Sequence, residues 1–176
     1  MCSIHNSSIV EDNFDEPSLH VSSHAHISRR ELRSLIFHLL YAAESHEYEE
    51  SIEMIADNLS KGFIAHLSSD NETISIARKV ITDRDSLDEI YKPLLTNWRF
   101  DRISIAIKLI LRLAVWELTN TETNPKIIIN EAVELAKLFA EEDAYRFING
   151  ILDSIANKTF KDTDLQTIDD EPSPAN

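Results

Sequence analysis

The segment from Arg102 to Leu118 constrains the fold more than any other part of this sequence. At about 100° of rotation per residue, its polar side chains Ser104, Lys108 and Arg112 fall on one narrow stripe, and nearly all its other positions are apolar. Other elements must cover such a helix on most of its surface. The polar stripe argues against a membrane span, which needs about 20 apolar residues. We therefore predict a central helix inside a helical domain.

The composition of the chain favours an all-α fold. Its 176 residues suffice for one domain with a single core. Two glycines and five prolines leave little turn chemistry for a sheet-rich fold. The single cysteine, Cys2, allows no internal disulfide, and we recognise no apolar segment typical of a secretory signal. We expect a cytoplasmic protein without membrane association.

Charge and apolar content divide the chain into a centre and two tails. The formal net charge is −14, of which residues 1–27 and 161–176 carry −4 each, leaving −6 on residues 28–160. The tails lack sustained apolar periodicity, so we expect them to be disordered and acidic, with one helical domain over 28–160. Any nucleic-acid site in so acidic a chain must be a local basic patch.

Apolar periodicity predicts the helices of this domain. The first helix is expected to start at Ser28, because Ser28 and Glu31 form the sequence signature of a capping box. Gly150 lies inside the last predicted helix, where it costs about 1 kcal/mol relative to Ala, which suggests that another backbone passes close to it. Besides the central helix, further helical regions are expected over approximately residues 49–67, 72–93, 125–140 and 142–157.

Three arginines gather in the first turns of the first predicted helix, at Arg29, Arg30 and Arg33. Cations there oppose the helix dipole, so local helix stability does not explain them. One interpretation is a solvated helix end. The other is a phosphate-binding patch, because guanidinium groups bind phosphate oxygens bidentately. No further Lys or Arg appears before Lys61.

The sequence holds no recognisable catalytic or cofactor motif. Gly-rich phosphate loops, Cys-x-x-Cys pairs, His-Glu-x-x-His and nucleophile elbows do not occur. Paired acids such as Glu131 and Glu134 are typical of solvated helix faces. His20, His24 and His26 cluster in the first tail without Cys or a closing ligand pair. We expect no enzyme activity, cofactor or metal.

Several motifs together resemble the NusB family of transcription antitermination factors. The resemblance covers about residues 29–158 and includes the Arg-rich first helix that ends in Leu40-Tyr41. Its motifs are Asn97-Trp98, Leu111-Arg112-Leu113-Ala114 with Glu117-Leu118, Pro125, Ile129-Asn130-Glu131-Ala132-Val133-Glu134-Leu135-Ala136-Lys137 and Phe147-Ile148-Asn149-Gly150-Ile151-Leu152-Asp153. The resemblance implies two small helical bundles packed together and a role without catalysis.

The resemblance also implies partners and site residues. NusB factors pair with NusE, a small-subunit ribosomal protein, and bind boxA elements of nascent RNA, especially in ribosomal RNA leaders, within an RNA polymerase antitermination complex. Phe147 also shares the apolar face of its helix, so core packing is a second interpretation for it. The positions carried over are Arg29, Arg30, Arg33 and Asp143 for RNA and Tyr41 and Phe147 for NusE.

Two departures and two alternatives accompany this interpretation. Ile107 stands where the family often has an acid, so it either packs or alters the partner surface, and His38 replaces a usual Gln. The net acidity favours, as one alternative, a helical adaptor that has lost RNA binding. The other is a NusB-like module associated with a ribosomal RNA methyltransferase, although no cofactor-binding domain is recognised here.

Overall fold

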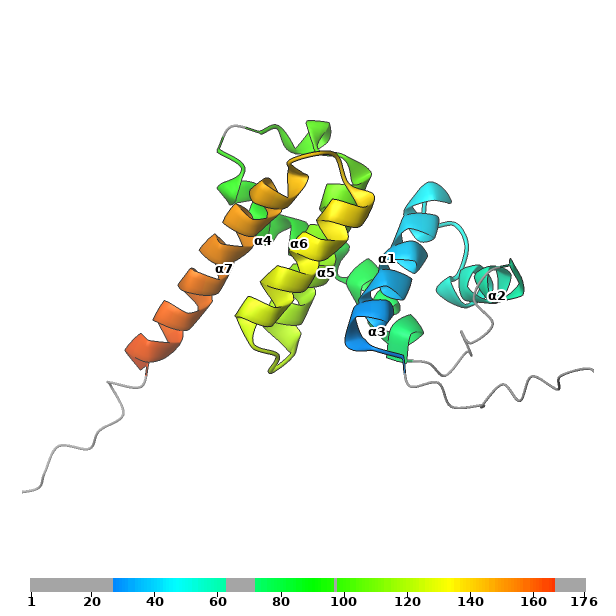
Figure 1. The fold of residues 1–176 in the computed structure, drawn as a ribbon, viewed down its shortest axis with the longest axis horizontal. Helices are drawn as coiled ribbons and strands as arrows, with labels where there is room; N and C mark the ends of the chain where they lie inside the picture. Colours follow the sequence, from blue (N-terminus) through cyan, green and yellow to red (C-terminus); the bar gives the residue numbers. More distant parts are fainter. Residues whose placement is uncertain (1–26, 63–71, 97, 167–176) are drawn as a thin grey trace, which may run out of the picture.

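The computed structural model describes residues 27–62, 72–96 and 98–166, with the backbone alone for 159–166. No β-strand occurs in these ranges, which confirms the predicted all-α class. The elements are α1 (Arg29–Ser45), α2 (Ile52–Gly62), α3 (Glu72–Thr82), α4 (Arg84–Tyr91), the 3₁₀ turns η1 (Lys92–Leu94) and η2 (Phe100–Arg102), α5 (Ile105–Asn120), α6 (Pro125–Phe139) and α7 (Ala144–Gln166) (Figure 1).

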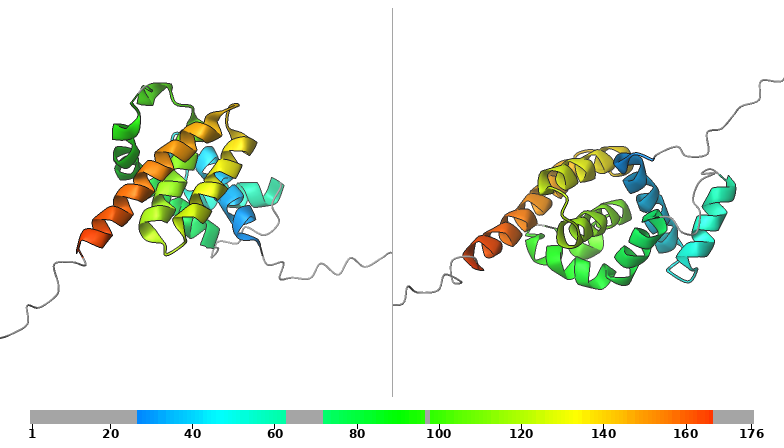
Figure 2. Two further views of the ribbon diagram at one scale, coloured as in Figure 1. Left: turned by 60° about the vertical axis from the view of Figure 1, so that its left-hand side comes forward. Right: turned by 90° about the horizontal axis from the view of Figure 1, so that it is seen from below.

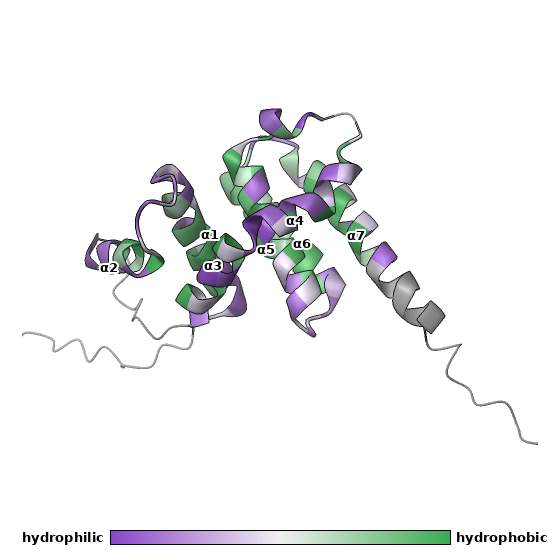
Figure 3. Ribbon diagram, turned by 180° about the vertical axis from the view of Figure 1, so that it is seen from behind, coloured by the Kyte–Doolittle hydropathy of each residue, from purple (hydrophilic) through white to green (hydrophobic). Residues whose placement is uncertain are grey.

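The helices form two bundles that meet along α5. Helices α1, α2 and α3 make the first bundle, and α4 to α7 make the second (Figure 1). Seen from below, α5 lies at the centre with other helices around it (Figure 2). From behind, α4 crosses in front of α5 and carries mostly hydrophilic residues (Figure 3). Nine residues of α5 are buried, which confirms the predicted central helix. They are Ile107, Leu109, Ile110, Leu111, Arg112, Leu113, Ala114, Val115 and Trp116.

The helix starts follow the local sequence. The Ser28 side chain accepts a hydrogen bond from the Glu31 backbone N–H, and the Glu31 carboxylate accepts one from the Ser28 N–H at 2.8 Å, so the predicted capping box is present. This contact lowers the pKa of Glu31. Ser104 caps α5, and Pro125 takes the first position of α6, where its missing N–H removes no helical hydrogen bond.

Three helix predictions need correction. The region predicted from residue 72 to residue 93 is two helices, because the chain turns at Asp83 between α3 and α4. The helix predicted from residue 49 begins at Ile52, and residues 63–71 lie outside the described residues. Helix α7 runs past the predicted end at residue 157 to Gln166.

The prediction of a close backbone at Gly150 is wrong. Beyond α7's own neighbouring backbone, no described heavy atom lies within 4 Å of where a Cβ on Gly150 would stand. Gly150 borders a hollow between η1 and α7. Pro93 and Leu94 line the same hollow but do not reach the glycine.

Most of the two predicted tails lies outside the described residues, including Cys2 and the three tail histidines, so the domain boundaries at 28 and 160 stay predictions. In the described ranges, no helix is long and apolar enough to cross a membrane. The same ranges contain no group of three His, Cys, Asp or Glu side chains placed to hold a metal ion.

Candidate nucleic-acid interface

The first turns of α1, which we call the arginine end, bring each of the three predicted arginines to a carboxylate from a distant part of the chain. Arg29 Nη1 donates to Glu72 Oε1 on α3 at 2.9 Å. Arg30 donates from Nε and Nη2 to both oxygens of Glu131 on α6, at 3.2 and 2.9 Å. Positive charge therefore gathers here, but each guanidinium already has an anionic partner.

Arg33 is the buried member of the arginine end. It is 5% exposed, and its Nε and Nη2 donate to the Glu117 carboxylate on α5 at 2.9 and 2.8 Å. Its Nη1 points to the Arg29 carbonyl at 3.4 Å. The guanidinium is thus enclosed between α1 and α5, where it holds the two bundles together rather than facing solvent.

Arg29 and Arg30 are the solvent-facing members. Their side chains are 74% and 58% exposed. The hydrogen bond and charge of Glu131 raise the pKa of Arg30 above its ordinary value. Exposed ion pairs contribute little net stability, because water competes for both charges. A phosphate can therefore replace Glu72, which is 56% exposed, at small energetic cost, whereas Glu131 is only 15% exposed and pairs more firmly with Arg30.

Farther along α1, four rings form what we call the aromatic patch, made of Phe37, His38, Tyr41 and Phe139. Phe37 and Phe139 stack with centroids 4.6 Å apart, and His38 meets Phe139 edge-on at 5.1 Å. Tyr41 is 46% exposed. It borders a shallow apolar hollow between α1, α2 and the end of α6. The predicted partner residue Tyr41 is therefore available at the surface.

Phe147 lies on a second surface, at the start of α7. It packs against the exposed Trp98 with ring centroids 5.2 Å apart. The two rings border a hollow of about 310 Å³ whose floor includes Ile107. Ile107 is 8% exposed, so the apolar replacement at this position packs into the fold. Phe147 itself is half-buried, so part of its ring packs in the fold and part is accessible to a partner.

Asp143 stands on the acidic rim of the same hollow, in the turn between α6 and α7. Its backbone has φ of 70°, and its carboxylate pairs with Arg146 at 3.4 Å. This turn lies at one end of the bundle, whereas the arginine end of α1 lies at the other (Figure 1). The structure therefore groups Asp143 with Phe147 and separates it from the three arginines.

Sequence reasoning missed the carboxylates that hold the arginine end. Glu72, Glu117 and Glu131 come from three different helices, separated from their arginines by 43, 84 and 101 positions. No local pattern signals such pairs. Glu131 reads from sequence as one acid on a solvated face, and only the packing of α1 beside α6 gives it a partner.

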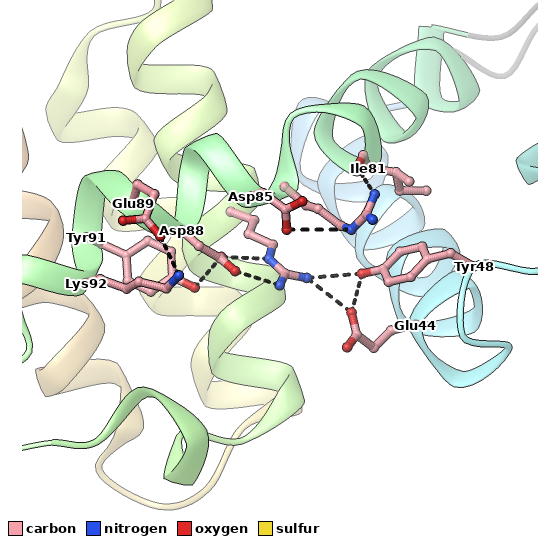
Figure 4. Close-up of polar contacts among 10 residues, drawn as sticks. Glu44, Tyr48, Ile81, Asp85, Asp88, Glu89, Tyr91 and Lys92 are labelled. Carbon is pink, nitrogen blue, oxygen red and sulfur yellow. Dashed lines mark hydrogen bonds and ion pairs between the residues drawn. The ribbon is translucent and has the colours of Figure 1, made fainter.

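A buried polar network surrounds Arg112, between the two bundles (Figure 4). Arg112 on α5 donates to Asp88 on α4 at 2.8 and 2.9 Å, and to Glu44 and Tyr48 near the end of α1 at 3.1 and 3.0 Å. Tyr91 donates to Asp88 at 2.7 Å. The network spans both bundles.

Burial and hydrogen bonding shift the pKa values in this network in different directions. Burial raises the pKa of Tyr48 to about 12, assisted by its hydrogen bond to Glu44. Burial also acts to raise the pKa of Asp88, but the hydrogen bonds from Arg112 and Tyr91 outweigh it, so the pKa of Asp88 is lowered. The network is therefore held by a charged Asp88 against a charged Arg112.

Together, these features define a class: a two-bundle, all-α protein with an arginine-rich helix end and two aromatic surfaces. The sequence comparisons identify it further, because the family model described as "NusB family" matches residues 30–157. The chain belongs to the NusB family.

Individual relatives agree with this assignment. The transcription antitermination protein NusB of Staphylococcus carnosus is 38% identical over 139 residues, covering 73% of this chain and 99% of the relative. The protein of that name from Anaeromyxobacter dehalogenans is 35% identical over 116 residues, covering 64% and 82%. The solved structure of T. maritima NusB matches with a TM-score of 0.59 and 27% identity, over 74% of this chain and 92% of that one.

Proposed function

We propose that this protein is a transcription antitermination factor that binds boxA-type RNA of ribosomal RNA leaders together with a NusE-type ribosomal protein. It acts without catalysis, within an RNA polymerase antitermination complex in the cytoplasm. Membership of the NusB family supports this role. The observation that carries the RNA part is the pair of exposed guanidinium groups, Arg29 and Arg30, at one helix end of an acidic protein.

The chemistry of the arginine end suits a single RNA strand. Guanidinium groups bind phosphate oxygens through two parallel hydrogen bonds, and unpaired bases can stack on their flat faces. Arg29 and Arg30 supply these contacts directly. Arg33 contributes by fixing α1 against α5, because its own guanidinium is enclosed by Glu117.

The partner surface combines the aromatic patch with the Phe147 side of the bundle. Exposed aromatic side chains often dominate the binding energy of protein interfaces. Tyr41 and Phe147 are proposed to contact the NusE-type protein. Asp143, beside Phe147 and away from the arginine end, is proposed to border the RNA where the strand reaches the partner surface.

The RNA test replaces Arg29 and Arg30 together by Ala and measures binding of boxA and scrambled RNA across a salt series. We expect lower boxA affinity and a log–log salt slope reduced by about 1.4, from about 0.7 per lost phosphate contact. Arg99→Ala is the matched control, because Arg99 forms a similar exposed bidentate pair with Asp101 elsewhere. Unaltered boxA affinity in the double variant contradicts the assignment.

The partner test replaces Tyr41 by Ala and measures binding of the NusE-type protein. Because Tyr41 is exposed, its removal leaves the fold intact, and we expect affinity to fall about tenfold or more. Tyr145→Ala, which removes a half-buried Tyr on α7, is the control. Equal partner affinity in Tyr41→Ala and the unaltered protein contradicts the proposed surface.

The second candidate function is a protein adaptor without RNA binding. The observation in its favour is that all three arginines of the arginine end are paired with carboxylates. Firm binding of the NusE-type protein, with no boxA affinity in its presence or absence, supports the adaptor. Methyl transfer to RNA from radiolabelled S-adenosylmethionine would instead support the methyltransferase-associated alternative.

A further inference from the structure

A groove of about 530 Å³ lies beside the arginine end and shares Arg29 and Arg33 with it. It runs between α1, α3, the end of α5 and the start of α6. We call it the Lys79 groove, and its lining includes Arg29, Leu32, Lys79, Trp116, Thr121 and Ile127.

The groove is a local exception to the acidity of the chain. Three cations line it, Arg29, Arg33 and Lys79, against two anions, Glu72 and Glu117. The two glutamates are each paired with an arginine at 2.9 and 2.8 Å. The groove therefore has a net positive charge, which attracts an anionic ligand.

Of the three cations that line the groove, Lys79 is the one without a carboxylate partner among the described residues. Within the described residues its ammonium has no carboxylate at ion-pair distance, and it lies 5.8 Å from the centroid of the Trp116 ring. The contact is a cation–π interaction, which is weak at an exposed site. Lys79 is exposed and can turn to an anion without breaking an ion pair.

The remaining lining of the groove has two further kinds of chemistry. Leu32 and Ile127 form apolar flanks, and Ile127 is 52% exposed although it is a large aliphatic residue. Thr121 and Thr123 place hydroxyl groups at the edge. A nucleotide presents the same three parts: an anionic phosphate, a hydroxyl-bearing sugar and a base with apolar faces.

We propose that the Lys79 groove binds one unpaired nucleotide of RNA, with Lys79 and Arg29 on its phosphate and its base against Ile127 and Leu32. This rests on the proposed function, because the same RNA strand must pass the arginine end. It adds a subsite that selects single-stranded over paired RNA, since a paired base cannot turn into the groove.

The first test compares Lys79→Gln with Lys92→Gln, using a single-stranded boxA-type RNA of about 12 nucleotides, within the length range that single-strand sites cover. Lys92 is the control because its ammonium also lies over an aromatic ring, that of Phe100 at 4.6 Å, but is already paired with Glu89 at 2.6 Å. We expect Lys79→Gln alone to lower affinity about fivefold and to reduce the salt slope by about 0.7. Equal affinities of the two variants overturn the proposal.

The second test follows the base rather than the charge. The chain has two tryptophans, so Trp98→Phe leaves Trp116 as the only reporter. We expect RNA to quench Trp116 fluorescence, and less so after Ile127→Asp than after Leu138→Asp, since both aliphatic residues are exposed on α6 but only Ile127 lines the groove. RNA binding without a change in Trp116 emission overturns the proposal.

These outcomes separate the subsite from the proposed function. RNA affinity that is lost in the Arg29 and Arg30 double variant but unchanged in Lys79→Gln overturns the subsite and leaves the function standing. Absence of RNA binding by the unaltered protein, with and without its NusE-type partner, overturns both.

Discussion

At the residue scale, the guanidinium groups of the arginine end differ in how firmly their carboxylates hold them. Arg33 and Glu117 form a nearly enclosed pair, with side chains 6% and 13% exposed. Removing one partner of such a pair leaves a buried charge uncompensated, which is strongly destabilising. Arg29 and Glu72 both lie in water, where an ion pair contributes at most about 1 kcal/mol, whereas Arg30 is exposed but its partner Glu131 is only 15% exposed. The Arg33 pair is structural, the Arg29 pair can be exchanged for a ligand, and the Arg30 pair lies between these two cases.

Glu131 competes with RNA for Arg30, so Glu131→Gln should raise RNA affinity. We expect about a threefold increase, because the amide no longer holds Arg30 by charge while phosphate still does. Fluorescence anisotropy with boxA RNA measures the change. Glu142→Gln, which makes the same charge change in the exposed turn before α7, is the control. A fall in affinity would mean that Glu131 positions Arg30 for RNA.

At the element scale, α1 connects the two candidate surfaces. Its first turns carry Arg29 and Arg30, and Tyr41 follows Arg30 by about 16 Å at 1.5 Å per residue. Helix α6 runs beside it, pairing Glu131 with Arg30 and Phe139 with Phe37. The spacing of the exposed arginines and the aromatic patch is therefore set by α1, which meets α6 through side chains at both points.

Replacing Gly150 in α7 by alanine is expected to stabilise the protein. The residue has no positive φ, and its open side has room for a methyl group. Gly150→Ala should therefore stabilise the protein by about 1 kcal/mol, because it restricts the unfolded chain and favours the helix. Thermal unfolding should show a melting temperature higher by a few degrees, about 2–4 °C for a chain of this size. A lower melting temperature would show that the site is more crowded than its geometry indicates.

At the scale of the whole molecule, the Arg112 network fixes the two bundles relative to each other. Arg112 is 7% exposed and bonds to α4 in its own bundle and to α1 in the other. All described buried side-chain polar atoms have hydrogen-bond partners, so the network is fully satisfied. A satisfied buried network specifies one arrangement, since any other docking of the bundles leaves charges unpaired.

The charge of Asp88 gives the stability of this arrangement a defined pH dependence. The pKa of Asp88 is lowered in the folded protein, so its contribution is full above its unfolded pKa of about 3.9 and is lost as pH falls through the lower folded value. Asp88→Asn should destabilise the protein by about 3 kcal/mol or more at pH 7, because Arg112 then lacks its main anion.

Urea unfolding of the two proteins at pH 7 and below pH 4 measures this effect. The difference in free energy of unfolding should shrink at the acidic pH. Asp153→Asn, at an exposed position of α7, serves as the control. A difference that is constant with pH would show that Asp88 is not the titrating group.

The sequence by itself determined the all-α class, the buried central helix and the capped start of α1, because periodicity and capping are encoded within a few neighbouring residues. It also placed Arg29, Arg30 and Tyr41 on an accessible helix. Only the tertiary structure decided that Arg33 is enclosed, that Asp143 lies away from the arginines, and that the Lys79 groove exists. These facts depend on side chains from helices that are dozens of residues apart, and their meeting is set by how the bundles pack.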